Sequence, residues 1–208
     1  DGTLHVMNVG FSGPGFYLKN STVDLVSADG FAHVDGTWIE SSTITTLGNT
    51  DLNMGGSVVT NSYIGTFRLD GWGSPVAITY NEIGLLDVDR WRAGSNTLEY
   101  NDLSEIVWSR PSTSSQAVLN YNNIDSSEPT LLALTGSDGH ERVDAANNYW
   151  GTAATAELVA GTTNITAIHD FWDDFNLVEV DFSGFRTSPV SSAGPAPRPS
   201  RRTARGGP

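Results

Sequence analysis

A short frame of residues recurs along this chain at intervals of about 20 residues. In ITYNEIG (78–84), LEYNDLS (98–104) and LNYNNID (119–125) it reads aliphatic, any residue, Tyr, Asn, any residue, aliphatic. Similar segments on both sides give equivalent positions at 20, 41, 61, 81, 101, 122 and 147, spaced by 21, 20, 20, 20, 21 and 25 residues. This spacing constrains the fold more than any other feature, because each repeat must form one structural unit.

A unit of about 20 residues is too short for the helix pairs of most helical repeats, and leucine-rich signatures are missing. It matches one coil of a parallel β-helix, in which three short strands alternate with three turns. Alternation within a strand predicts that Ile78, Tyr80 and Ile83 point inward and that Thr79 and Glu82 face solvent. The sequence therefore predicts an all-β fold, a single-stranded parallel β-helix of about six to seven short rungs.

The asparagine of the frame has a structural role in such a coil. Asn tolerates the left-handed backbone angles of a tight turn, and amides stacked at about 4.8 Å can hydrogen-bond along the axis. Such a ladder satisfies polar groups in the interior, and we favour it over a role in ligand binding. The predicted ladder consists of Asn20, Asn61, Asn81, Asn101, Asn122 and Asn147.

The chain divides into one domain and a tail. Residues 1–152 are predicted to form the β-helix rungs, 153–190 a C-terminal cap of the same domain, and 191–208 a tail rich in Pro, Gly and Arg. Apolar residues make up 38% and charged residues 17% of the 208 residues, a balance that argues against disorder outside the tail. No run of about 18 apolar residues occurs, so we expect no transmembrane segment.

The charge is unevenly distributed. The chain has a net charge of -13, but the tail carries four arginines and no acid, so residues 1–190 carry -13 - 4 = -17. Such an acidic body excludes nucleic acid as a partner and suits a cation or a basic partner. The tail should be disordered as a free linker, or should lie on the acidic body of a neighbouring copy or of another partner. The tail residues predicted to bind that partner are Arg198, Arg201, Arg202 and Arg205.

The end of the repeat region carries a more specific pattern. The rung NNYWGT (147–152) is followed by AATAELVAG and then by IHDFWDDFNLVEVDFSGFRTSP (168–189). With the repeats, the N-N-x-W-G rung and the D-x-x-D-D segment resemble the right-handed parallel β-helix proteins of the pectin-lyase-like superfamily, over about residues 16–190. Many secreted bacterial and archaeal members end in this way, so the resemblance implies right-handed winding and an extracellular or cell-surface location. It implies no single activity, because the superfamily includes polysaccharide lyases, hydrolases, epimerases, adhesins and passive modules.

The resemblance also directs attention to one outer face. Enzymes of this superfamily commonly carry acids, often holding calcium, beside an arginine or lysine base on the outside of one strand stack. The matching outward residues of this chain are Arg68, Asp70, Trp72, Asp87, Asp89, Arg90, Trp91 and Arg92. Their carboxylates could bind calcium, and their tryptophans and arginines could hold an acidic sugar. Alternatively, the charged residues form solvated pairs across rungs, and Trp72, Trp91 and Trp108 cover strand ends or fill the core.

A second oxygen-rich group lies in HDFWDDFN, where Asp170, Asp173 and Asp174 could form a calcium site. Helix capping and turn formation explain the same residues. The sequence therefore requires no cofactor, and calcium is the one that it allows.

These observations favour a non-catalytic role. Of the N-T-D, D-D, G-H-G and R-I-K set of polygalacturonases, G-H-G and R-I-K do not occur, so the set is not complete and no catalytic residue can be assigned. We expect an extracellular or cell-surface β-helix module for assembly or adhesion, such as a subunit of a larger assembly. Its partners would be other subunits or further copies, bound through the basic tail and the solenoid ends, or an acidic polysaccharide. The alternatives are an enzyme similar to a polysaccharide lyase or epimerase acting on an acidic glycan, and a glycan-binding module that uses Trp72, Trp91 and their arginines.

Overall fold

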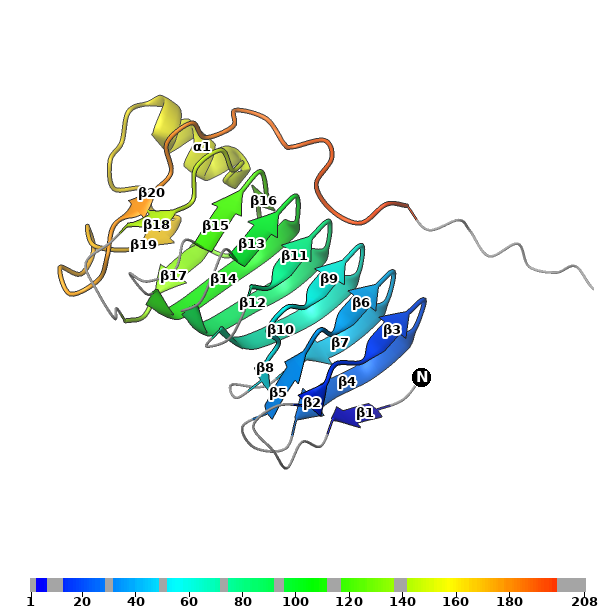
Figure 1. Ribbon diagram of the computed structural model, residues 1–208. Coiled ribbons are helices and arrows are strands. Elements are labelled where there is room, and N and C mark those ends of the chain that lie inside the picture. Colours follow the sequence, from blue (N-terminus) through cyan, green and yellow to red (C-terminus); the bar gives the residue numbers. More distant parts are fainter. Residues whose placement is uncertain are drawn as a thin grey trace, which may run out of the picture.

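The computed structural model describes residues 3–6, 13–28, 32–48, 52–71, 75–91, 96–111, 117–136 and 142–197. They form a solenoid of parallel β-strands (Figure 1). The predicted all-β parallel solenoid is therefore confirmed. The solenoid makes about four turns, slightly fewer than the predicted six to seven rungs.

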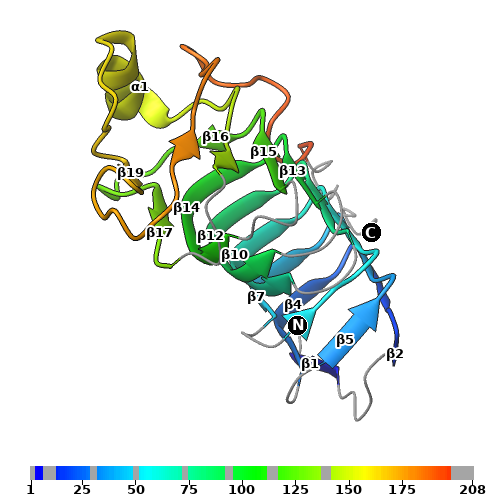
Figure 2. The same ribbon diagram turned by 60° about the vertical axis from the view of Figure 1, so that its left-hand side comes forward.

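Three sheets form the walls of the solenoid, and their strands pair in parallel. The first sheet runs through β1 (Thr3–Val6), β4 (Thr22–Ala28), β7 (Thr43–Leu47), β10 (Tyr63–Gly71), β12 (Glu82–Trp91), β14 (Asp102–Pro111), β17 (Leu132–Leu134) and β19 (Ile168–His169), with β16 (Asn123–Ile124) beside β14. The second runs through β3 (Tyr17–Lys19), β6 (Trp38–Glu40), β9 (Val58–Thr60), β11 (Ala77–Thr79), β13 (Asn96–Glu99), β15 (Ala117–Asn120), β18 (Val143–Asp144) and β20 (Val180–Asp181). The third contains β2 (Gly13–Pro14), β5 (Ala32–Asp35) and β8 (Leu52–Asn53). Figure 2 shows β4, β7, β10, β12 and β14 stacked one behind the other.

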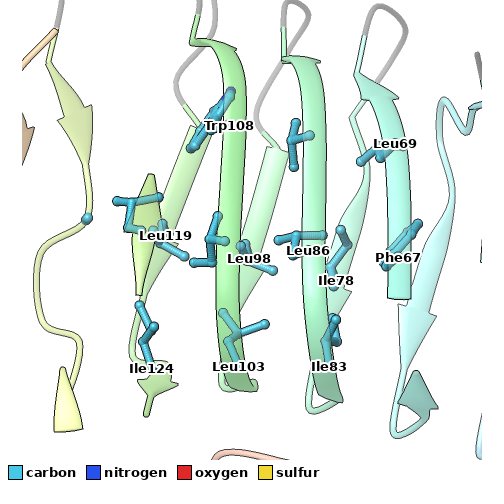
Figure 3. Close-up of a cluster of buried hydrophobic side chains, with 14 of the residues drawn as sticks. Phe67, Leu69, Ile78, Ile83, Leu86, Leu98, Leu103, Trp108, Leu119 and Ile124 are labelled. Carbon is cyan, nitrogen blue, oxygen red and sulfur yellow. The ribbon is translucent and has the colours of Figure 1, made fainter. Parts of the chain in front are cut away.

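Equivalent residues of successive coils lie over one another, because the coil length keeps the register. Leu86 pairs with Phe67 on one side and with Ile106 on the other. The side chains of all three are at most 1% exposed and belong to the hydrophobic column inside the solenoid, in which Figure 3 labels Phe67 and Leu86. Burial of each such side chain contributes about 1.5–3 kcal/mol, so this column supplies most of the driving force for stacking.

The turn from the second sheet into the first holds a residue with left-handed backbone angles in seven successive coils. These residues are Asn20, Ser41, Asn61, Tyr80, Tyr100, Tyr121 and Asn147, with φ between 52° and 60°. The side chain at this position points away from the interior, as the 42% exposure of Tyr80 shows, and the prediction that Tyr80 points inward was wrong.

The residue after each turn points inward and forms a ladder along the axis. The Nδ2 atom of Asn81 donates to Oδ1 of Asn101 (3.1 Å), Asn101 donates likewise to Asn122 (3.0 Å), and Asn122 to Asn148 (3.1 Å). All four side chains are fully buried. The bonds satisfy amides that have no access to water, which is the physical condition for burying them.

Serines continue this ladder toward the N-terminus. The backbone N–H of Ser42 donates to Oγ of Ser62 (3.1 Å), and that of Ser62 donates to Oδ1 of Asn81 (3.0 Å). The prediction that Asn20, Asn61 and Asn147 belong to the ladder was therefore wrong, because these residues occupy the left-handed position one residue earlier. The left-handed residues at 61 and 80 are only 19 positions apart, so alignment on the asparagine letter mixed two structural positions.

The C-terminal part continues the solenoid before the chain turns back. Helix α1 (Gly151–Val159) follows the fully buried Trp150, and β19 and β20 extend the two long sheets. No helix within the described residues is long and apolar enough to span a membrane. After Phe182 and Phe185, which pack against the core, the chain reverses along the solenoid. Residues 186–197 are called the C-terminal strap below.

Candidate ligand-binding groove

The structure places only part of the predicted ligand face. Arg68 on β10 and Asp87 on β12 are neighbours in register, and Nε of Arg68 lies 3.3 Å from Oδ2 of Asp87. Both side chains are accessible to solvent, so the pair contributes about 0–1 kcal/mol. Trp108 is only 3% exposed and belongs to the core. These placements match the alternative of solvated pairs and core tryptophans.

Of the remaining predicted residues of this face, the structure describes the side chain of Asp89 alone. Asp89 is half-buried and takes part in an interaction. Asp70, Arg90 and Trp91 belong to strands β10 and β12, but their side chains lie outside the described part of the structure, as do Trp72 and Arg92 entirely.

The three carboxylates of the predicted calcium site accept hydrogen bonds from backbone N–H groups of the C-terminal segment. Asp170 is 2% exposed and accepts hydrogen bonds from the backbone N–H groups of Trp172 (3.0 Å) and Val180 (2.9 Å). Burial raises the pKa of Asp170, and these two bonds oppose the rise. Asp173 accepts from the Asp170 N–H (3.2 Å), and Asp174 from the N–H of Asn176 (2.9 Å). Within the described ranges, no three His, Cys, Asp or Glu side chains are placed to share a metal ion.

A different surface is assembled where the C-terminal strap crosses the left-handed turns. The N–H of Arg186 donates to the carbonyl of Asn148 (2.8 Å). Val190 and Asn123 exchange two bonds, from the Val190 N–H to Oδ1 (2.7 Å) and from Nδ2 to the Val190 carbonyl (3.2 Å). The strap thus begins against the C-terminal coils and proceeds toward the N-terminal end.

Two further bonds hold the strap farther along. The N–H of Gly194 donates to the carbonyl of Tyr100 (2.9 Å), and the N–H of Ala196 donates to Oδ1 of Asn61 (2.6 Å). Residues 191–197 of the predicted tail therefore lie against the turns of their own chain. The arginines of the tail, Arg198, Arg201, Arg202 and Arg205, lie outside the described residues.

Gly194 is the residue that lets the strap approach so closely. Its φ is +81°, a left-handed angle that favours glycine. A Cβ atom at this position would collide with the carboxylate of Asp102. The ring of the neighbouring Pro195 fixes its own φ, which lowers the backbone entropy lost on docking.

Three tyrosines line the turn edge beside the strap. The rings of Tyr80 and Tyr100 stack with centroids 5.2 Å apart and planes 6° apart, and those of Tyr100 and Tyr121 at 5.5 Å and 9°. The guanidinium carbon of Arg186 lies 5.3 Å from the Tyr121 ring centroid and reaches it from the coil beyond, since Arg186 is bonded to Asn148. A left-handed backbone costs a non-glycine residue about 1–2 kcal/mol. Three successive strained tyrosines are the kind of feature that accompanies a functional site.

Two adjoining hollows lie between the tyrosines and the strap. One has a volume of about 570 Å³ and is bordered by Thr60, Asn61, Tyr80 and strap residues 191–197. The other, of about 410 Å³, is bordered by Tyr100, Tyr121, Arg186 and residues 188–192. Ser191 and Ser192 border both, so the hollows form one elongated depression, called the tyrosine groove below.

A third hollow, of about 310 Å³, borders the strap at Pro189. It is lined by Glu82, Asp102 and Asp125 together with Asn123 and Tyr149, among others. Oδ1 of Asp102 accepts a hydrogen bond from Nδ2 of Asn123 (2.7 Å). The three carboxylates make this hollow strongly acidic, which disfavours an anionic ligand there.

Comparison of the chain with family models, with curated proteins and with solved structures found no match. The chemistry of the groove therefore rests on its own residues. The sequence contained one signal for it, the tyrosine that precedes the asparagine in three successive frames. The strap had no such signal, because its composition is typical of a disordered linker.

Proposed function

We propose that this protein is a non-catalytic β-helix module, extracellular or at the cell surface, that serves adhesion or assembly by binding a glycan along the tyrosine groove. The observation that supports it most is the groove itself, in which solvent-accessible aromatic rings and hydroxyl side chains line a depression several coils long. Aromatic faces bordered by hydrogen-bonding groups suit sugar rings, which have apolar C–H faces and polar rims. Membership of the pectin-lyase-like superfamily belongs to the same proposal, and the parallel solenoid is consistent with it.

A rigid groove suits binding without catalysis. Its walls are held by the ladder on the inside and by the strap bonds on the outside, so little ordering is needed when a chain of sugars docks. This preorganisation favours retention of a polymer.

Binding and catalysis can be separated in one experiment. The purified protein is mixed with insoluble neutral and acidic polysaccharides, and the bound fraction and the soluble products are measured. We expect sedimentation with at least one polysaccharide and no newly released sugar. Unsaturated products that absorb in the near ultraviolet, released from a uronate polymer, would overturn the proposal in favour of a lyase, and no binding to any polysaccharide would remove its adhesive part.

Assembly through the solenoid ends is the second candidate. Among the described residues, β3 is the terminal strand of its sheet, and Tyr17 on β3 is 62% exposed. An unpaired strand edge with an exposed aromatic residue favours pairing with another chain. Sedimentation velocity would test this, because a Tyr17→Lys variant should remain monomeric at concentrations at which the unaltered chain forms oligomers. A chain that is monomeric at all concentrations would contradict this candidate.

A further inference from the structure

The tyrosine stack ends abruptly at Tyr80. One face of this ring is covered by Tyr100, whereas the preceding coil has Asn61 at the equivalent turn position. The row of stacked rings therefore ends at Tyr80. The adjacent coil has Asn61 at this turn, and the strap is bonded to it there. Tyr80 is 42% exposed, and the larger hollow of the groove lies between its ring and Asn61. The other end differs, because Arg186 lies over Tyr121 there.

The walls of this hollow are polar but uncharged. On the solenoid side they consist of Thr60, Asn61 and Tyr80, and on the strap side of residues 191–197. None of these described lining residues carries a charge at neutral pH, although residues 1–190 carry a charge of -17. A neutral ligand thus meets no unpaired charge, whereas an anionic ligand would be repelled by the surrounding acidic body.

The wall formed by Asn61 is fixed before any ligand arrives. Its Oδ1 accepts the Ala196 N–H at 2.6 Å, and its Nδ2 donates to Oγ of Ser41 at 2.9 Å. The hydroxyl groups of Thr60, Ser191 and Ser192 remain at the rim. The hollow therefore combines one free aromatic face, a rigid polar wall and hydroxyl groups around it, within the volume range of ligand pockets.

We propose that this hollow is a subsite for one neutral hexopyranose ring of a glycan, with the C–H face of the sugar stacked on the free face of Tyr80. The sugar hydroxyls bond to the Thr60, Ser191 and Ser192 side chains. This inference rests on the proposed function and adds to it the position, the stacking residue and the neutral character of the ligand.

The variant Tyr80→Asn provides a test that respects the backbone. Asn already occupies the same left-handed position at Asn20, Asn61 and Asn147, so the substitution removes the ring without adding strain. The comparison variant is Tyr121→Asn, which also removes a ring that borders the groove, but from the end of the stack that Arg186 covers. The probes are cellohexaose and laminarihexaose as neutral sugars and hexagalacturonate as the acidic sugar, titrated by calorimetry.

We expect the unaltered protein to bind at least one neutral hexasaccharide more tightly than hexagalacturonate. Tyr80→Asn should weaken that binding about tenfold and Tyr121→Asn less than about threefold, from the contribution of one aromatic contact. Tyr80→Phe should bind like the unaltered protein. Saturation transfer from tyrosine ring protons to the sugar C–H protons of the unaltered protein gives a second readout that requires no variant.

The outcomes distinguish this inference from the proposed function. Binding that is restricted to hexagalacturonate, or that Tyr80→Asn leaves unchanged, overturns the Tyr80 subsite while glycan binding stands. Absence of saturation transfer to a bound neutral sugar also overturns it. Failure of every soluble and insoluble glycan to bind overturns the proposed glycan binding as well.

Discussion

The N-terminal coils (residues 17–71) and the tyrosine coils (residues 77–134) form the same turn with different residues. In the N-terminal coils, Asn or Ser takes the left-handed position and Ser the inward position after it. In the tyrosine coils, Tyr takes the left-handed position and Asn the inward one. In the tyrosine coils, Asn, which tolerates left-handed angles well, thus occupies the inward position one residue later. Tyr, which tolerates these angles poorly, occupies the left-handed position that faces outward.

The hydrogen bonds explain what the exchange achieves. Nδ2 of Asn101 donates to the carbonyl of Ile78 (2.9 Å) and to Oδ1 of Asn122 (3.0 Å), while its Oδ1 accepts the Asn81 N–H (2.9 Å). An inward asparagine thus ties its own coil to the coils on both sides. Because the ladder fixes these turns from inside, the tyrosines can be held in a strained conformation that points them toward the groove.

An inward serine makes fewer links between coils. Oγ of Ser62 accepts the N–H of Ser42 in the coil before (3.1 Å) but donates within its own coil, to the carbonyl of Thr60 (2.9 Å). The N-terminal coils therefore have a weaker side-chain connection along the axis. We expect the two regions to respond differently to the same kind of substitution.

The largest difference is expected from truncation of the ladder. Asn101→Ala leaves the amide of Asn81, the N–H of Asn81 and the carbonyl of Ile78 without their partner, and should lower the free energy of unfolding by about 3 kcal/mol or more. Ser62→Ala should lower it by about 1 kcal/mol. Equilibrium unfolding in urea measures both, and equal losses would show that the asparagine ladder adds no stability over the serine ladder.

A smaller effect is expected where the strap crosses the tyrosine coils. Gly194→Ala adds a methyl group against Asp102 at a left-handed backbone angle and should weaken docking of the strap by about 1–2 kcal/mol. Cleavage of residues 186–197 by a protease of broad specificity should then be roughly tenfold faster. Ser192→Ala, at an exposed strap position, is the control and should leave the rate unchanged. Equal rates for both variants would mean that the Gly194 contact does not hold the strap.

Exchange of the turn residues between the two regions should change the free energy of unfolding by unequal amounts. Tyr100→Asn relieves left-handed strain but removes two ring contacts, so its unfolding free energy should stay within about 1 kcal/mol of the unaltered protein. Asn61→Tyr adds strain and removes the bonds to Ala196 and Ser41, so it should destabilise by about 2 kcal/mol. A stabilising Asn61→Tyr, measured in the same urea assay, would contradict the proposed division of roles.

The smallest effect concerns an ion pair in the N-terminal coils. Nζ of Lys19 lies 3.0 Å from Oε2 of Glu40, and this hydrogen bond lowers the pKa of Glu40 and raises that of Lys19. The contribution of Glu40 to the free energy of unfolding is present above the ordinary Glu pKa of about 4.3. It is lost as the pH falls through the lowered pKa of Glu40. The contribution of Lys19 is complete below the ordinary Lys pKa of about 10.4 and is lost as the pH rises through its raised pKa.

Thermal unfolding of Glu40→Gln should reveal this dependence. Its midpoint should lie slightly below that of the unaltered protein at neutral pH and low salt. The difference should disappear in acid and at high salt, because the pair is then protonated or screened. A difference that persists at low pH would assign the effect to packing rather than to charge.

The coil length and the hydrophobic column were predictable from the sequence. Repeats of equal length place equivalent residues of successive coils in register. Ile78 therefore pairs with Leu98, and this does not depend on the conformation of the turn. The inward position of Asn81 followed from the same repeat. The outward position of Tyr80 was not predictable in this way. A single left-handed residue reverses the alternation of side chains, and a tyrosine, unlike Gly or Asn, gives no signal in the sequence that its backbone is left-handed.

The groove was less predictable than the fold. Arg68 and Asp87 were expected on an outer face and meet there, but as an accessible ion pair. The tyrosine groove depends on a segment more than 60 residues farther along the chain, as the bonds between Val190 and Asn123 show. A contact of that kind leaves no periodic trace in composition.

The sequence by itself determined that this chain stacks into a parallel solenoid, because the repeat length is a local property that recurs in every coil. The tertiary structure decided which residue of each Tyr-Asn pair faces outward and where residues 186–197 lie. Both depend on forces between distant residues, the axial hydrogen bonds of the ladder and the docking of the strap on the turns, and these exist only once the coils are stacked.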